Sequence, residues 1–351
     1  MIELAPGYAI SRLVKGGWQL AGGHGPVDRE VALDDMFRFV EEGITTFDCA
    51  DIYTGVEKLI GEFLRRYRER YGAEAAARLH VHTKFVPDLA ELPRLTRAGV
   101  ERAIDRSLAR LGVERLDLVQ FHWWDYEVPR WVEIGLHLAE LQRKGKIRHL
   151  GATNFDVPGL AILLEAGVPV VSHQVQYSLI DRRPEHGMVA LCAERGVGLL
   201  CYGSLLGGFL SEAWLGAPEP PPPHENRSLT KYKLILEEFG SWAAFQSVLR
   251  ALRAVGEQHG VGIGSVALRW VLDRPRVTAV IVGARNAKHL AAATRALDLS
   301  LDTEDLRRLD AACAAGSGPR GDTYALERVK GGRHAVIIRY DLNEREHRPL
   351  A

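Results

Sequence analysis

The chain has 351 residues, enough for one large α/β domain or two ordinary domains, and 46% of them are hydrophobic, which is typical of a folded globular protein. Its 45 Lys and Arg residues balance 45 Asp and Glu residues, so the zero net charge gives no electrostatic case for nucleic acid or an anionic membrane as the main partner. A small molecule, or a cofactor held by local charges, fits this composition better.

Neither a membrane span nor export has support in the sequence. No apolar run approaches the roughly 18 residues that a span needs, and the N-terminal residues lack the basic and then apolar pattern of a secretory signal. We therefore expect a cytoplasmic protein. Its four cysteines are scattered without CxxC pairs, so we expect reduced, mostly buried thiols and neither disulfides nor a thiolate metal site.

Short β-rich runs alternate with longer segments of helical periodicity along most of the chain. This alternation predicts repeated βα units and a parallel sheet. Eight strands, each followed by a helix, point to the α/β class and to a closed (β/α)₈ barrel, the TIM barrel. The predicted strands cover residues 12–18, 44–48, 79–86, 116–122, 147–152, 170–175, 197–202 and 277–282.

Two segments depart from this regular spacing. The gap between the seventh and eighth strands contains the run 218–223, which is rich in proline, so we expect residues 204–231 to form a long loop over the barrel. Residues 316–351 are a polar C-terminal tail with a β-like island at 335–340. We predict a single domain over residues 1–351, with a barrel core of about 8–315, and a tail that packs on the barrel or mediates assembly.

Polar or ionisable residues stand at seven of the predicted strand ends. The C-terminal ends of the strands carry the active site in TIM barrels, so these side chains should share one rim. Among them are Asp48, Lys84 and His122, with Tyr53 just beyond the second strand. A phenol has an ordinary pKa near 10, and a nearby ammonium would lower it. Lys84 could supply that cation to Tyr53.

This set has a coherent chemical interpretation. Asp48 would anchor Lys84, and His122 could donate a hydrogen bond to a carbonyl oxygen. The combination suits protonation of a developing alkoxide during hydride delivery to a carbonyl. Each residue also has a purely structural interpretation, because a strand-end Asp is often a cap and a lone His or Tyr is often a core residue. Lys84 is the hardest to explain in this way, because it lies in an apolar strand.

The usual dinucleotide-binding fingerprint is missing. Residues 260–264 (GVGIG) lie inside a helical pattern, and residues 22–25 (GGHG) form a loop without the GxGxxG spacing. A Rossmann domain is therefore not expected.

Three segments carry a resemblance to a known family. With residues 48–55 (DCADIYTG), 82–84 (HTK) and 120–122 (QFH), the chain resembles the aldo-keto reductases over roughly residues 8–315. The resemblance implies a (β/α)₈ barrel that binds NADPH without a Rossmann fold. It also implies that Tyr53 is the proton donor, that Lys84 and Asp48 tune it, and that His122 orients the carbonyl.

The same resemblance implies a set of cofactor contacts. Thr153, Asn154 and Gln174 match the family's nicotinamide contacts, and Tyr202 matches the stacking aromatic. Arg285 could pair with a 2′-phosphate, which favours NADPH over NADH. Where many members hold the adenine, this chain has Ala292 and Ala293. The full implied set is Gly17, Trp18, Thr153, Asn154, Gln174, Tyr202, Gly203, Ser204, Leu205, Gly283, Arg285 and His289.

For the substrate, Trp18, Trp123 and Trp124 could form an aromatic wall, with His24 in the loop above the first strand. We interpret the protein as an NADP(H)-dependent oxidoreductase that interconverts a small aldehyde or ketone and its alcohol. One alternative is an NADP(H)-binding regulatory or redox-sensing protein on the same barrel. Another is a metal-dependent barrel hydrolase that uses Asp48, His122 and His173, which the cation of Lys84 disfavours; we expect no metal.

Overall fold

The computed structural model describes residues 1–343 and contains a closed barrel of eight parallel strands. The barrel closes where β10 pairs with β3, in register from Val280 and Leu13 to Gly283 and Gly16. The predicted TIM barrel is confirmed: each strand overlaps its predicted range, and β7, β8 and β10 extend one residue beyond it. The barrel strands are β3 (Leu13–Gly16), β4 (Thr46–Asp48), β5 (His80–Phe85), β6 (Leu116–Phe121), β7 (Ile147–Thr153), β8 (Val170–Gln176), β9 (Gly198–Tyr202) and β10 (Val277–Gly283).

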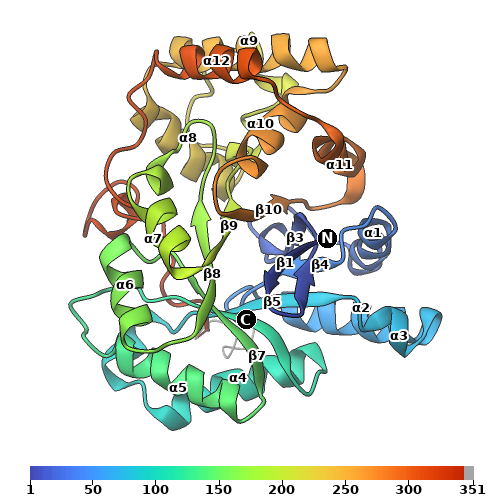
Figure 1. Ribbon diagram of the computed structural model, residues 1–351, viewed down its shortest axis with the longest axis vertical. Coiled ribbons are helices and arrows are strands. Elements are labelled where there is room, and N and C mark those ends of the chain that lie inside the picture. The colour runs from blue at the N-terminus through green and yellow to red at the C-terminus, as the bar shows by residue number, and fades with distance from the viewer. Residues whose placement is uncertain (344–351) are drawn as a thin grey trace.

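Helices surround this barrel, with α9 and α12 at the top of the view in Figure 1 and α4 and α5 at the bottom. Side-chain caps fix several helix starts, as where Asp28 accepts the Val31 amide and Asp156 accepts the Gly159 amide. The helices are α1 (Arg29–Glu41), α2 (Val56–Tyr71), α3 (Ala73–Ala76), α4 (Arg97–Leu111), α5 (Trp131–Arg143), α6 (Val157–Glu165), α7 (Met188–Arg195), α8 (Arg227–Phe239), α9 (Trp242–His259), α10 (Ile263–Leu272), α11 (Leu290–Asp298) and α12 (Thr303–Cys313).

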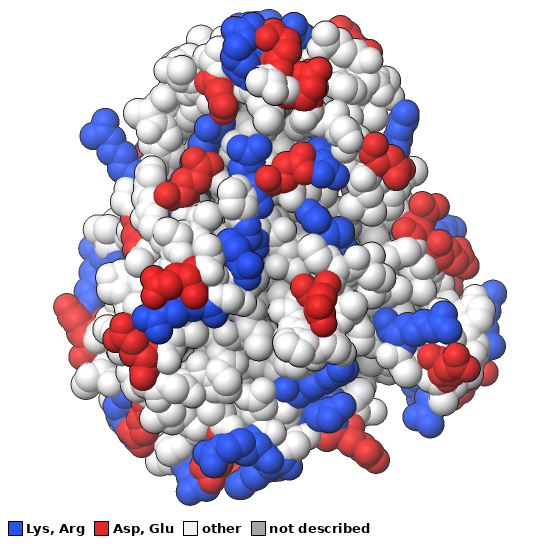
Figure 2. Space-filling model, in the orientation of Figure 1, with Lys and Arg blue, Asp and Glu red and all other residues white. Residues whose placement is uncertain are grey.

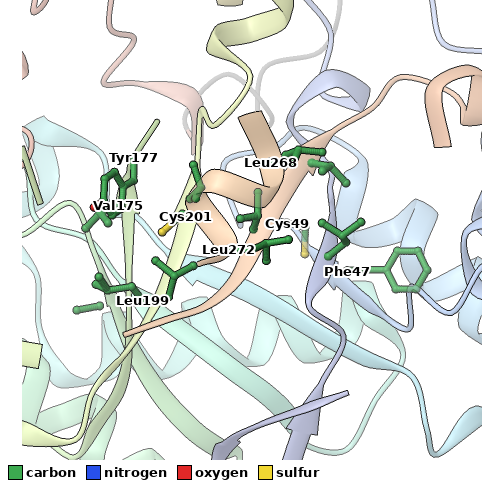
Figure 3. Close-up of a cluster of buried hydrophobic side chains, with 14 of the residues drawn as sticks. Phe47, Cys49, Val175, Tyr177, Leu199, Cys201, Leu268 and Leu272 are labelled. Atoms are coloured by element: carbon green, nitrogen blue, oxygen red, sulfur yellow. The ribbon is translucent and has the colours of Figure 1, made fainter. Parts of the chain in front are cut away.

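The main core lies between the outer face of the barrel and the helices. Leu268 and Leu272 of α10 lie among buried side chains of neighbouring strands, with Phe47, Cys49 and Cys201 in the same view (Figure 3). Burying such side chains stabilises the fold by about 1.5–3 kcal/mol each. The four cysteines are free thiols, three of them buried, as expected.

An N-terminal hairpin that we did not predict closes the opposite end of the barrel from the site. It consists of β1 (Ile2–Ala5) and β2 (Tyr8–Ile10), which pair antiparallel. The Tyr8 hydroxyl lies 3.1 Å from His82 Nε2 inside the barrel. Strands of three and four residues are too short to show a clear alternation in the sequence.

Three expectations of secondary structure were wrong. The loop expected over 204–231 ends earlier, because Asn226 caps α8 and the helix starts at Arg227. Residues 260–264 are not inside one helix, since Gly260 adopts a left-handed conformation that ends α9 before α10 begins. The island at 335–340 is not a strand: residues 335–337 form turns and the rest is irregular.

The tail packs back on the barrel within the described residues. Asp322 accepts a hydrogen bond from the Val157 amide at the start of α6, and the carbonyl of Gly321 lies 3.3 Å from His186 Nδ1 near α7. The tail, red in Figure 1, therefore crosses the end of the barrel at which the strands finish. The residues beyond 343, the last part of the predicted tail, lie outside the described residues.

The surface is mixed in charge. Figure 2 shows Lys and Arg interspersed with Asp and Glu over the face in view, in keeping with the zero net charge. None of the helices in residues 1–343 combines the length and hydrophobicity of a transmembrane segment.

Candidate active site

The four predicted catalytic side chains come from adjacent parts of the barrel rim, and Lys84 lies at their centre. Lys84 Nζ donates to Asp48 Oδ2 at 2.6 Å and to the carbonyl of Cys49 at 2.9 Å. It also lies 5.1 Å from the centre of the Tyr53 ring. The strand register explains this meeting, because β4 and β5 are neighbours and both end at the rim. The ammonium is thus shared between a buried carboxylate and a phenol.

Asp48 is held by two amides as well as by Lys84. Its Oδ1 accepts hydrogen bonds from Gln120 Nε2 at 2.8 Å and from Gln174 Nε2 at 2.7 Å. Buried charges are tolerated where such partners satisfy them. The sequence analysis gave Gln120 no role of its own, although a polar residue in the apolar strand 116–122 was a usable signal.

Thr83, the residue before Lys84, is anchored on the outer side of the barrel. Its hydroxyl donates to Glu57 of α2 at 2.6 Å, and Arg110 of α4 lies 3.1 Å from the other oxygen of that carboxylate. Because successive side chains of a strand point to opposite faces, this outward anchor fixes the inward direction of Lys84.

The pKa values of Lys84 and Tyr53 follow from their burial and from the charges of their neighbours. Burial alone would lower the pKa of Lys84, but the Asp48 carboxylate and Tyr53 outweigh it and raise that pKa to about 12. Burial raises the pKa of Tyr53, and Lys84 opposes this shift without reversing it. The expected net lowering of the Tyr53 pKa is therefore wrong: the hydroxyl stays protonated at neutral pH and is ready to donate.

His122 follows β6 at the rim, and its role differs from the expectation. Its Nδ1 lies 3.1 Å from the Thr153 carbonyl oxygen, which can only accept, so Nδ1 carries the proton. Burial and the charge of Arg328 lower the pKa of His122 to about 3. The ring is neutral and its Nε2 is an acceptor, so it does not donate a hydrogen bond to a carbonyl oxygen as we had predicted.

Gly17 and Trp18 form one side of the rim. The Gly17 amide donates to the Asp48 carbonyl at 2.7 Å, and Trp18 lies with its ring centre 5.1 Å from that of Tyr53. A Cβ at Gly17 would come within 2.8 Å of Val56 and 2.9 Å of the Asp48 carbonyl. Glycine is therefore required for β3 to approach the Asp48 strand this closely.

We expect Gly17→Ala to destabilise the protein by about 1–3 kcal/mol, because the added methyl group forces the backbone of Asp48 or the helix at Val56 to move. Urea unfolding measures this loss. Gly264→Ala is the matched control, since its Cβ would meet nothing closer than 3.8 Å inside α10. Equal stability of the two variants would contradict this account of the packing.

The predicted nicotinamide contacts gather at the ends of β7, β8 and β9. The Tyr202 hydroxyl donates to Asn154 Oδ1 at 2.9 Å, and the Thr153 hydroxyl donates to the Gln174 carbonyl at 3.2 Å. Both hydrogens of the Gln174 amide are used, on Asp48 and on Gln120. Asn154 Nδ2 and Gln174 Oε1 form no hydrogen bond with any described residue. Asn154 therefore offers a donor to a ligand, and Gln174 offers an acceptor.

The predicted phosphate contacts lie further along the same rim. Ser204 is buried and its hydroxyl donates to the Tyr177 carbonyl at 3.0 Å, while Gly203 has a left-handed backbone against Tyr232. Beyond β10, Gly283 and Arg285 are exposed, and Arg285 donates to the carbonyl of His24 at 2.7 Å. Of the remaining predicted contacts, Leu205 is partly exposed, and His289, at the start of α11, is exposed.

The predicted substrate residues separate into two groups. Trp124 lies beside His122, with ring centres 4.2 Å apart, and His24 Nε2 lies 2.8 Å from the Ser228 hydroxyl of α8. Trp123, in contrast, is 0% exposed, and its indole N–H donates to the carbonyl of Asp125. Trp123 therefore packs in the core and does not belong to the substrate wall.

The alternative metal site is not assembled. Asp48 is occupied by Lys84 and two amides, and His173 Nε2 lies 3.0 Å from the carbonyl of Phe155. Within residues 1–343, no three His, Cys, Asp or Glu side chains lie where they could share a metal ion.

The family of the chain is shown by comparison with known proteins. The model of the aldo/keto reductase family matches residues 12–314, so the chain belongs to the aldo-keto reductases, as the resemblance indicated. It is an enzyme of that family, whose members act on small-molecule carbonyls with a nicotinamide cofactor.

Individual relatives are distant. L-glyceraldehyde 3-phosphate reductase of Escherichia coli O157:H7 is 28% identical over 328 residues, which cover 88% of this chain and 91% of that protein. Flagellar radial spoke protein 5 of Chlamydomonas reinhardtii is 30% identical over 263 residues, and the match covers 64% of this chain but only 49% of that protein. A solved thermostable aldo-keto reductase, Tm1743 in complex with the inhibitor epalrestat, superposes with a TM-score of 0.67 at 26% identity, covering 86% of this chain and 95% of that one.

Proposed function

We propose that the protein reduces small aldehydes or ketones, or oxidises the corresponding alcohols, with NADP(H) and with Tyr53 as the general acid and base. The observation that carries this proposal is the position of Lys84 between the Asp48 carboxylate and the Tyr53 ring. A cation so placed stabilises the phenolate that forms when Tyr53 gives up its proton.

The rim fits a nicotinamide cofactor. A primary carboxamide has one acceptor and two donor hydrogens, which complement the donor of Asn154 and the acceptor of Gln174. Tyr202, held by its hydrogen bond to Asn154, would stack on the ring. When bound, the cofactor supplies the hydride. The carbonyl oxygen then takes the proton of the Tyr53 hydroxyl, while Asp48 keeps Lys84 beside the phenolate.

The experiment that tests this function combines binding with turnover. Fluorescence titration with NADPH and NADH shows whether the cofactor binds, and a panel of aldehydes and ketones with NADPH shows whether it is oxidised. We expect tight binding and turnover. Binding of NADPH without turnover of any carbonyl would favour the regulatory protein on the same barrel.

Arg285 provides a separate test of cofactor choice. Because a charge-assisted hydrogen bond to a phosphate contributes about 1.5–3 kcal/mol, Arg285→Ala should weaken NADPH binding by roughly ten- to a hundredfold and leave NADH binding within about twofold. Fluorescence titration measures both. Arg295→Ala, an exposed arginine on α11, is the charge-matched control. Equal losses for the two cofactors would refute a role in binding the 2′-phosphate.

A further inference from the structure

Arg328 of the C-terminal tail binds the backbone of the candidate active site. Its guanidinium donates to the carbonyl of Trp123 and to the carbonyl of Asn154, both at 2.8 Å. The same group lies over two aromatic rings, 4.3 Å from the centre of Tyr126 and 5.2 Å from that of Tyr324. A planar guanidinium is suited to this double contact, because it is pre-organised and can stack while it donates.

The two carbonyls that Arg328 binds are not arbitrary ones. Trp123 directly follows His122 at the end of β6, and Asn154 directly follows Thr153 at the end of β7. The Thr153 carbonyl is the one that accepts the Nδ1 proton of His122. Arg328 therefore joins two neighbouring strand ends on either side of the hydrogen bond that fixes the His122 ring.

The tail is anchored so that Arg328 reaches this position. The preceding residue, Glu327, lies 3.1 Å from Arg183, which is itself bound to Asp181 at 2.7 Å. All three side chains of this ion cluster are buried. Tyr324 lies edge-on to His122, with ring centres 5.6 Å apart. A buried ion cluster of this kind holds the tail in one position on the barrel.

Three charged or titratable groups around His122 disfavour its protonation. Arg328 faces it from the tail, Lys84 from β5 and His173 from β8, while Trp124 and Tyr324 cover it with aromatic surface. Burial makes the largest contribution to lowering the pKa of His122, and Arg328 is the strongest of these charges.

We propose that Arg328 is a positioning residue for His122: it holds the ring as the neutral, Nδ1-protonated form whose free Nε2 accepts a hydrogen bond. Nε2 of His122 is buried and has no hydrogen-bond partner among the described residues, in keeping with an acceptor reserved for a ligand. The part of this proposal that concerns turnover rests on the proposed function, whereas the state of the ring does not.

The test follows the ring nitrogens of His122 by ¹⁵N NMR between pH 5 and pH 8. The signals are assigned by their loss in a His122→Asn protein. We expect the wild type to show protonated Nδ1 and no titration in this range. Arg328→Met removes the charge and the bridge between the two strand ends, so the ¹⁵N shifts of His122 should move away from the wild-type values. Arg328→Lys keeps the charge and should shift them less. Arg339→Met removes an exposed charge of the same tail and should behave as wild type.

Turnover gives an independent comparison. Because small misplacements of a catalytic group are costly, we expect Arg328→Met to lower kcat by about ten- to a hundredfold and Arg328→Lys to lower it less. An Arg328→Met protein that melts as wild type and whose His122 nitrogens keep the wild-type shifts would overturn the proposal. If the wild type shows no turnover on any carbonyl, the proposed function fails, but the NMR comparison still decides the role of Arg328.

Discussion

Replacing Tyr53 with Phe is expected to abolish carbonyl reduction and to leave cofactor binding nearly unchanged. The hydroxyl is the proton donor of the proposed mechanism, and general acid catalysis of this kind contributes roughly 10²- to 10⁴-fold. Phe keeps the ring that packs against Trp18, with centres 5.1 Å apart, and the ring over which Lys84 lies. The loss should therefore come from the proton alone. Steady-state kinetics with NADPH and a reactive aldehyde measures it.

The control for this variant is Tyr71→Phe, which removes a hydroxyl from a tyrosine that is 43% exposed on α2. It should have wild-type kinetics. Fluorescence titration should give a Kd for NADPH within about twofold of the wild type in both variants, because Tyr53 is not among the groups that face the carboxamide. Turnover by Tyr53→Phe within tenfold of the wild type would remove Tyr53 from the mechanism.

The barrel and its rim could be predicted because the signals are local. Each strand is a short apolar run, and parallel strands end at one rim, so the sequence position of Asp48, Lys84 and His122 is sufficient to bring them together. Resemblance to a family then supplied their roles. The direction of the hydrogen bond at His122 could not be predicted, because it depends on which carbonyl faces Nδ1 after folding.

The contribution of the tail could not be predicted for a different reason. Arg328 and Glu327 lie in a polar segment without periodicity, and their partners Trp123, Asn154 and Arg183 are more than a hundred residues earlier in the sequence. Only the folded chain brings these groups together. Trp123 and Trp124 show the same limit on a smaller scale, since adjacent tryptophans on one strand end point to the core and to the site.

Replacing Lys84 with Met is expected to cost both stability and activity. The Lys84 and Asp48 side chains are 6% and 4% exposed and lie 2.6 Å apart, so the substitution leaves a buried carboxylate without its cation. Breaking such a pair costs about 3–5 kcal/mol. Urea unfolding at pH 7.5 measures the loss. Lys144→Met, from a half-exposed pair with Glu101, is the control and should cost no more than about 1 kcal/mol.

The double variant Asp48→Asn with Lys84→Met separates the two roles of the pair. Removing both charges eliminates the uncompensated carboxylate, so most of the lost stability should return, while turnover should stay low because Tyr53 still lacks its cation. Recovery of turnover along with stability would show that Lys84 acts only on the fold.

The pH dependence of the two directions sharpens this test. Folding raises the pKa of Lys84 from 10.5 to about 12, so the pair stabilises the protein fully below pH 10.5 and loses that contribution as the pH rises through 12. Lys84 also lowers the pKa of Tyr53 against the effect of burial. Without Lys84 the phenolate is harder to form, so both directions should slow, because carbonyl reduction produces the phenolate and alcohol oxidation uses it as the base. The pH at which alcohol oxidation reaches its full rate should also move upward in Lys84→Met. An unchanged pH profile of alcohol oxidation would mean that Lys84 does not act through the ionisation of Tyr53.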